Sequence, residues 1–376
     1  MPPSSSEAEA AGAVEGGPGL APPTSAEAVV AADPISAGLL TETGTALPRG
    51  RRRLRIFRGI SGFIVRRILL GVLTLFVASI IIFAATQALP GDPARAVLGR
   101  TATPESLAAL REQLGLDKPV TEQYWDWLSG VLTGDLGTSL VAGQPVSELL
   151  GSRLVNSAFL MLLAALVSVP LAILIGVVSA RRRDGPLDHT LSVVTLALAA
   201  LPEFVVGIAF VVLLGTTVFE VLPPVSLIPP DEAPWNYPKE LILPTLTLVV
   251  AVTPYISRIM RASMIEVLES DYVEMARLKG LRERKVVWGH ALPNAVAPAI
   301  QVTAINLAYL AGGIVVVEFV FAYPGIGAAL VDGVENRDIP VVQAVALIIA
   351  AVYVILNLIA DVATILVSPR VRTALR

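Results

Sequence analysis

The 376-residue sequence contains no cysteine and only two histidines, His189 and His290, which lie about a hundred residues apart. The absence of cysteine excludes disulfides, thiolate metal sites and cysteine nucleophiles. The histidines are too far apart for a paired metal-binding motif, so we predict no metal site. None of the four lysines follows a glycine, which excludes the Gly-Lys-Ser/Thr of a P-loop. Charged residues make up 16% of the chain, against about 25% in ordinary soluble proteins.

In place of charge, the sequence has long apolar stretches. No Asp, Glu, Lys or Arg occurs in residues 68–91, 154–180, 241–257, 286–317 or 339–360, and 189–219 is interrupted only by Glu203. About 20 apolar residues suffice for a helix to cross the hydrocarbon core. We predict an all-α polytopic membrane protein with about six transmembrane helices, at 64–88, 156–180, 190–219, 241–262, 295–320 and 343–367. Such continuous blocks exclude a transmembrane barrel.

The amino-terminal part differs from the rest. Residues 1–48 are rich in Ala, Pro, Gly and Ser and contain no basic or aromatic residue, so we expect a disordered tail. Residues 49–67 form a basic juxtamembrane segment with eight arginines, which favours the anionic lipids of the cytoplasmic leaflet. The predicted cytoplasmic segments hold 21 of the 28 basic residues, and this predicts that both termini are cytoplasmic. The position against a spanning helix argues against nucleic-acid binding.

The predicted transmembrane domain, residues 64–372, contains two patterned loops. The outer loop, 90–155, has a helix start at Thr103-Pro104-Glu105. In the inner loop, 263–294, Asp271 and Glu274 have the spacing of a capping box, and Gly280 stands where a left-handed cap ends a helix. These signals predict a helix over 272–279.

A helix of two turns is marginal in water unless something packs on it. Ala276 and Gly280 would give it a low profile that fits a groove of a partner, with the basic residues after Gly280 at the rim. From the residues alone, an ordinary connecting loop remains an equal alternative.

The inner loop resembles the EAA signature of bacterial ABC-importer permeases. The match comprises Glu274–Gly280 and, nine residues later, His290–Pro293, with Met275 in place of the central alanine. Further stretches resemble the dipeptide/oligopeptide branch of that family: 89–93, 113–119, 134–139, 258–261, 271–273, 318–327, 337–340 and 368–372. The resemblance covers about residues 60–372 and points to the first of the two permease subunits.

The resemblance implies a type I permease fold in the bacterial cytoplasmic (inner) membrane. It implies a second homologous permease subunit, two ATP-binding subunits and an extracytoplasmic solute-binding protein as partners. This chain would not be an enzyme and would hold no cofactor, since ATP and magnesium would bind in the ATPase subunits. The implied cargo is a dipeptide or oligopeptide, with nickel or glutathione as the alternative. The residues implied to couple to the ATPase are Asp271, Tyr272, Glu274, Ala276, Lys279, Gly280, Arg282, Leu292 and Pro293.

A second group of residues is predicted to lie along the pathway or between subunits. Glu203, next to Pro202, is the acid of the third span and should face water or a partner helix; a protonated structural glutamate is equally compatible. Arg258 and Arg261 share a helix face at the inner end of the fourth span. Glu318 and Asp361, close to helix ends, are expected to snorkel toward water in structural roles.

On the predicted outer face, the turn at 323–327 contains glycines that permit close approach of another backbone. Tyr323, Pro324, Gly325 and Gly327 are therefore predicted to contact the binding protein.

Two functions of other classes compete with an ATP-driven importer. A proton-coupled secondary transporter would use Glu203 as its relay, but we find no convincing repeat of the kind that such transporters show. A scaffold or channel subunit would leave the inner helix signature unexplained.

Overall fold

The structure is a computed structural model that describes residues 49–88, 91–98, 102–229 and 232–367. Across these ranges the chain is helical, with no β-strand and one isolated bridge between Thr138 and Pro145. The all-α prediction is therefore confirmed. The predicted tail at 1–48 and the motif at 368–372 lie outside the described residues. The chain divides after Arg53, and the fold described below is that of the second unit, within the described residues up to 367.

Five long helices are apolar enough to cross a membrane: α1 (Arg49–Gln87), α5 (Val146–Arg181), α8 (Pro238–Leu268), α11 (Leu292–Val320) and α13 (Ile339–Val367). They match five of the six predicted spans. Several helices are longer than predicted, because the prediction followed charge-free runs. For example, α5 starts at Val146 and carries Glu148 and Arg153 in its first turns.

The remaining predicted span, the third in the chain at 190–219, is a broken helix. It consists of α6 (Pro186–Ala200), α7 (Glu203–Phe210) and a π-helical turn, η3 (Val211–Thr216), and the two parts meet at 102°. Leu201 is extended, with ψ of 130°, as expected for a residue before proline. Pro202 has no amide hydrogen to continue the helix, so the break follows from the sequence. Counted as one span, this pair brings the total to six.

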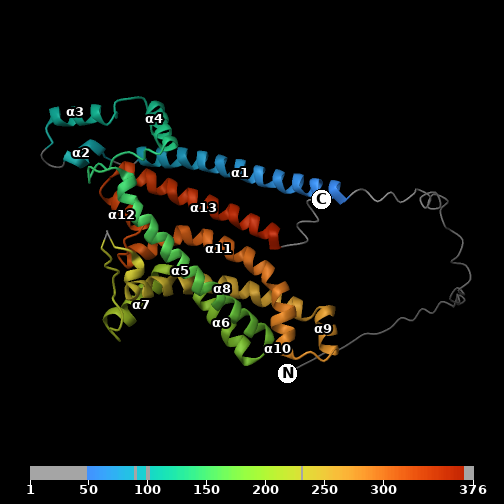
Figure 1. The fold of residues 1–376 in the computed structure, drawn as a ribbon. Helices are drawn as coiled ribbons and strands as arrows, with labels where there is room; N and C mark the ends of the chain where they lie inside the picture. The colour runs from blue at the N-terminus through green and yellow to red at the C-terminus, as the bar shows by residue number, and fades with distance from the viewer. Residues whose placement is uncertain (1–48, 89–90, 99–101, 230–231, 368–376) are drawn as a thin grey trace, which may run out of the picture. The chain divides into compact units, whose positions relative to one another are not determined.

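Helices α5, α8 and α11 form the centre of the fold, and α13 packs on α11 (Figure 1). Leu160 of α5, Leu248 of α8 and Leu310 of α11 are fully buried in one cluster. Gly176 of α5 allows the closest approach, since a methyl group there would lie 2.6 Å from the Met260 Cβ of α8. By contrast, most apolar side chains of α1 beyond residue 61 are exposed, as expected of a helix that meets lipid or another subunit.

The predicted outer loop contains three short helices: α2 (Pro93–Leu98), α3 (Pro104–Gln113) and α4 (Val120–Thr133). Thr103 caps α3 and its hydroxyl accepts a hydrogen bond from the Ser106 amide at 3.2 Å, which confirms the predicted helix start. Helix α4 docks on α1, because the Tyr124 and Trp127 rings lie 5.4 and 5.8 Å from the ring of Phe83.

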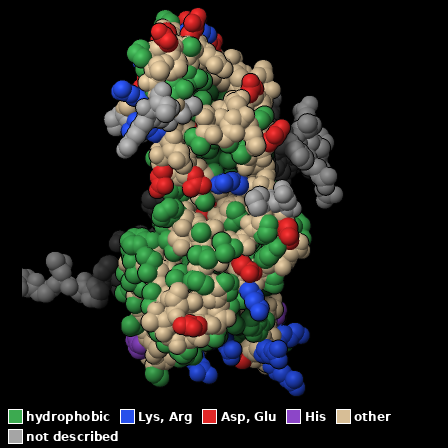
Figure 2. Space-filling model, turned by 90° about the vertical axis from the view of Figure 1, so that its left-hand side faces the viewer, with side chains coloured by type: hydrophobic (Ala, Val, Ile, Leu, Met, Phe, Trp, Pro, Cys, Tyr) green, Lys and Arg blue, Asp and Glu red, His purple; other side chains and the backbone are tan. Residues whose placement is uncertain are grey.

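The remaining short elements flank the long helices. They are η4 (Pro234–Asn236), α9 (Asp271–Leu278), α10 (Glu283–Lys285), the π-helix η5 (Val286–Ala291) and α12 (Ile326–Glu335). Lys and Arg side chains gather at the lower end of Figure 2, where Figure 1 places α6, α9 and α10. This accumulation of basic side chains agrees with the predicted cytoplasmic end.

Candidate functional site

Helix α9 forms from the predicted residues, but it starts differently. Its N-cap is Ser270, whose hydroxyl donates to the Val267 carbonyl and makes no cap hydrogen bond to α9. The predicted capping box of Asp271 and Glu274 is therefore wrong. Both carboxylates instead lie in the first turn, where they complement the positive end of the helix dipole.

The other end of α9 is as predicted. Gly280 has a φ of +75°, the left-handed conformation that side-chain-bearing residues rarely adopt. The Leu281 amide then donates to the Ala276 carbonyl at 3.3 Å, and the Gly280 amide donates to the Arg277 carbonyl at 2.9 Å. These bonds satisfy carbonyls that a helix end would otherwise leave unpaired. The helix therefore has the predicted length of about two turns.

One face of α9 packs on the chain itself. Val273 is fully buried and Ala276 is nearly so, in a cluster with Met260 and Met264 of α8 and Val286 of η5. The expectation that Ala276 fits a partner's groove is wrong, because its methyl group already contacts this cluster. The small side chain instead lets α9 lie close to the ends of α8 and η5.

The opposite face of α9 carries an exposed apolar stripe. Tyr272, Met275 and Leu278 follow each other at intervals of three residues, and their exposed fractions are 47%, 52% and 75%. Residues three apart on a helix share a face. The stripe is therefore an exposed apolar surface of α9, and the exposed carboxylates of Asp271 and Glu274 lie on the same helix.

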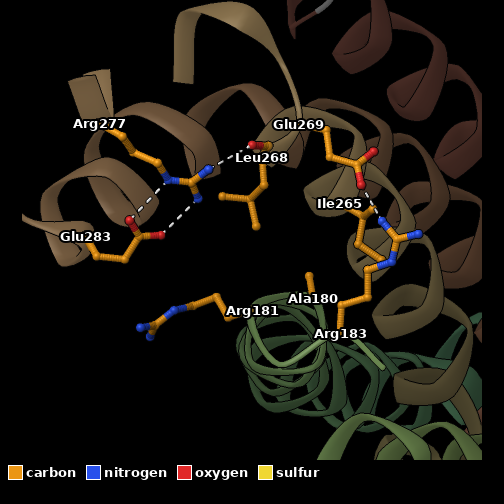
Figure 3. A pocket seen from close by; sticks show the side chains of 8 residues that line it. All are labelled: Ala180, Arg181, Arg183, Ile265, Leu268, Glu269, Arg277 and Glu283. Atoms are coloured by element: carbon orange, nitrogen blue, oxygen red, sulfur yellow. Dashed lines mark hydrogen bonds and ion pairs between the residues drawn. The ribbon is translucent and has the colours of Figure 1, made fainter. Parts of the chain in front are cut away.

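Arg277 braces α9 against the rest of the chain (Figure 3). Its guanidinium donates to both Glu283 oxygens, at 3.2 and 3.0 Å, and to the Leu268 carbonyl at 3.3 Å. The hydrogen bonds to the Glu283 carboxylate raise the pKa of Arg277 above its already high value, so this side chain stays charged. A cavity of about 280 Å³ lies beside the pair, between the ends of α5 and α8.

Two further ion pairs fix the neighbouring helix ends. Arg183 pairs with Glu269 (Figure 3), and Arg261 of α8 donates to both oxygens of the buried Asp188 of α6, at 2.7 and 2.6 Å. Arg261 thus holds the end of α8, as the sequence suggested. Arg258, predicted to act with it, is exposed and makes no such contact.

Of the remaining predicted coupling residues, three are exposed and one packs against the buried cluster. Lys279 and Arg282 are exposed on the link from α9 to α10. Leu292 packs against the cluster that also holds Val273, and Pro293 is exposed in the first turn of α11. Leu292 is thus part of the support for α9, and Pro293 is at the surface beside it.

At the other end of the molecule, the side chain of Glu318 is fully buried. Its carboxyl accepts hydrogen bonds from the Ser157 hydroxyl of α5 and from the Gly327 amide of α12, the latter at 2.6 Å. The prediction that Glu318 snorkels to water is wrong. The carboxyl instead pairs with the first free amides of α12, and this joins α12 to α11 and α5.

The turn between α11 and α12, next to the Glu318 carboxyl, is also buried. The Tyr323 hydroxyl donates to the Asn156 carbonyl at 2.8 Å, and burial raises the pKa of this hydroxyl, which keeps it a neutral donor. Tyr323, Gly325 and Gly327 are all buried, and only Pro324 is partly exposed. The prediction that this turn contacts a binding protein is therefore wrong for the three buried residues. Its glycines instead make room for the Glu318 carboxyl.

Asp361 and Glu203 remain partly accessible. Asp361 of α13 pairs with Arg67 of α1 at 2.8 Å, which joins two of the outer helices. Glu203 is the first residue of α7, directly after the break, with Pro202 as its N-cap. The break places it at a corner of the third predicted span, and a cavity adjoins this corner.

Sequence reasoning missed several residues of these sites. Met275 and Leu278 complete the exposed stripe, and their spacing from Tyr272 was visible in the sequence. Arg277, Glu283 and Asp188 gave no such signal, because their pairing depends on how the helices approach each other. Within the described residues, no group of three or more Asp, Glu or His side chains is placed to hold a metal ion.

Comparison with known families accounts for this arrangement. The family described as binding-protein-dependent transport system inner membrane component matches residues 172–373, and its N-terminal companion matches residues 60–166. The chain belongs to this family. It is therefore a multi-pass permease component of an ABC importer in the bacterial inner membrane, as the resemblance of the inner loop indicated.

Individual relatives agree over nearly their whole length. A probable peptide ABC transporter permease protein, y4tP, of Sinorhizobium fredii is 38% identical over 311 residues, which cover 82% of this chain and 99% of the relative. The glutathione transport system permease protein GsiC of Pectobacterium atrosepticum is 36% identical over 314 residues, covering 82% and 98%. The Escherichia coli K12 protein of the same name is 35% identical over 314 residues. The family models begin at residue 60, so they do not cover the tail at 1–48.

Proposed function

We propose that this chain is one of two permease subunits of an ATP-driven importer of dipeptides or oligopeptides, with both termini in the cytoplasm. The similarity to permeases named for peptide and for glutathione transport supports this cargo, because glutathione is itself a small peptide-like solute. The exposed apolar faces of α1, α6 and α7 leave surface for lipid and for a second permease.

The single observation that carries the coupling role is the exposed stripe of Tyr272, Met275 and Leu278 on α9. Its back is fixed by buried Val273 and Ala276, and its end is braced by Arg277. Because the buried face of α9 packs firmly on the chain, a displacement of the exposed stripe can move α8 and α11 as rigid elements. We infer that an ATP-binding subunit seats this stripe in a groove, and that ATP is hydrolysed there and not in this chain.

A substitution in the stripe tests the coupling role. Leu278→Glu puts a charge into the proposed interface, so the ATP-binding subunits should no longer copurify with the membrane-inserted chain. The matched control is Leu132→Glu on α4, where the side chain is 80% exposed and lies in the predicted outer loop. Copurification should survive in this control. Normal assembly of Leu278→Glu would refute the coupling role of α9.

The cargo is tested by uptake in a strain that lacks this chain. Labelled dipeptide, oligopeptide, glutathione and nickel are supplied separately, with and without depletion of ATP. We expect no peptide uptake in this strain and ATP-dependent uptake of the peptides once the chain is restored. Uptake of nickel alone would refute the peptide assignment, and uptake that persists without ATP would favour the proton-coupled alternative.

A further inference from the structure

A cavity of about 360 Å³ opens at the break between α6 and α7. It is lined by the end of α6, by Pro202 and Glu203, by Ala251 and Tyr255 of α8, and by Tyr309 of α11. Its size is within the range of small-ligand sites. Tyr255 and Tyr309 each lie 17 residues after the first residue of their helix, about 25 Å along it at 1.5 Å per residue. The cavity is therefore near the middle of both spanning helices.

Glu203 gives this cavity a negative group with no positive partner. Its carboxyl group is half-buried, and Tyr309 of α11 lines the same cavity. Among the described residues, no Lys or Arg pairs with it. Gly313 of α11 provides the space, because a methyl group there would lie 2.6 Å from a Glu203 carboxyl oxygen. A charged carboxylate in the middle of a membrane costs free energy when it has no counter-ion, and a bound cationic group lowers this cost.

The two tyrosines add surface suited to a cation. Their exposed fractions are 44% for Tyr255 and 59% for Tyr309, although both lie in spanning helices. The Tyr255 hydroxyl donates to the Ala199 carbonyl at 3.3 Å, so the ring is tethered at the mouth of the break. Aromatic rings near a carboxylate attract ammonium groups through the negative potential of their faces.

We propose that this cavity is a transient subsite for the ammonium group at the amino terminus of a transported peptide, with Glu203 as its counter-ion. The inference rests on the proposed peptide function. An amino-terminal ammonium is common to peptides of every sequence, so one fixed carboxylate serves cargo with varied side chains. The other residues that line the cavity, apart from the two tyrosines, are apolar or small, so they do not select among peptide side chains. A basic residue of the second permease is the competing partner for Glu203.

The absence of cysteine allows a direct test. Ala200→Cys places one thiol in this chain at the exposed end of α6 that lines the cavity. The complete complex, with its second permease and ATP-binding subunits, is treated with N-ethylmaleimide, and labelling of this chain is measured by mass. We expect trialanine to protect the thiol, and N-acetyl-trialanine to need about tenfold or more higher concentration, because it lacks a charged contact.

A second substitution identifies the counter-ion. Adding Glu203→Gln to Ala200→Cys should abolish the difference between the two peptides. The matched control is Glu220→Gln, an exposed acid just after η3, which should preserve the difference. Equal protection by both peptides, a difference that persists in Glu203→Gln, or a thiol that is never labelled with or without ATP would each overturn the subsite.

Uptake by the wild-type complex tests the peptide-import function separately from the subsite at Glu203. If the complex imports trialanine with ATP but shows no discrimination at the thiol, only the subsite is wrong. If the complex imports no peptide at all, the proposed function is wrong as well.

Discussion

Helix α9 and the turn between α11 and α12 are both short segments at the ends of long apolar helices. In α9 the polar groups of Asp271 and Glu274 are exposed, and an apolar stripe lies beside them. Tyr323 of the turn and Glu318, in the last turn of α11 just before it, are fully buried and bonded to α5 and α12. The first segment offers a surface to a partner, whereas the second holds the chain's own helices together. Burial of the polar groups distinguishes the two roles.

The largest loss of stability is expected at Glu318, and this variant tests whether the turn is a structural anchor. Glu318→Ala leaves the Gly327 amide and the Ser157 hydroxyl buried without their acceptor, which should lower the free energy of unfolding by about 3 kcal/mol. Thermal unfolding of the purified chain measures the loss. Glu335→Ala, an exposed acid of α12, is the control and should change little. A stable Glu318→Ala protein would show that the turn is not a structural anchor.

A smaller loss of stability is expected at Gly327. An added methyl group would collide with the Val315 backbone of α11 and with the Glu318 carboxyl, so Gly327→Ala should cost about 2 kcal/mol. The same unfolding measurement applies. Gly151→Ala on α5 meets open space and should be neutral or slightly stabilising. If both variants unfold alike, α12 does not pack as closely as described.

At α9, Arg277→Ala should affect coupling more than stability. The pair with Glu283 is partly exposed, so its loss should cost less than about 1 kcal/mol. Looser bracing of α9 should nevertheless reduce transport per ATP hydrolysed in the reconstituted complex. Lys118→Ala removes a similarly exposed pair with Asp126 in the predicted outer loop, and transport should not change. Equal coupling in both variants would show that the brace has no role.

The smallest effect on stability is expected at Glu274, which is exposed at the front of α9. Glu274→Lys should change the free energy of unfolding by no more than about 0.5 kcal/mol. Membrane insertion should remain normal while assembly with the ATP-binding subunits, or transport, is impaired. Glu266→Lys, an exposed acid of α8, should leave both normal. Normal uptake in Glu274→Lys would show that Glu274 is not part of the coupling surface, which would then consist of the apolar stripe alone.

Much of the fold was predictable because the signals are local. Apolar runs near 20 residues predicted the five continuous spans, and Pro202 marked the break in the third span. The left-handed Gly280 and the Thr103 cap were readable in the same way. The start of α9 was missed by one residue, since Ser270 and Asp271 are both acceptable caps and the sequence does not choose between them.

The site was less predictable, because a motif does not show which face of it is buried. Tyr323, Gly325 and Gly327 match the family pattern as well as the α9 residues do, yet they lie inside the fold. The same holds for Ala276, whose small size suggested a partner's groove but serves packing on α8.

By itself, the amino-acid sequence determined the class of protein, the family, and the helix start at Thr103, the break at Pro202 and the helix end at Gly280, since these depend on composition and on neighbours along the chain. Only the tertiary structure decided that Glu318 is an anchor, that Glu203 borders a cavity and that Tyr272, Met275 and Leu278 remain exposed. Those outcomes depend on contacts between residues far apart in the chain, and burial is a property of such contacts.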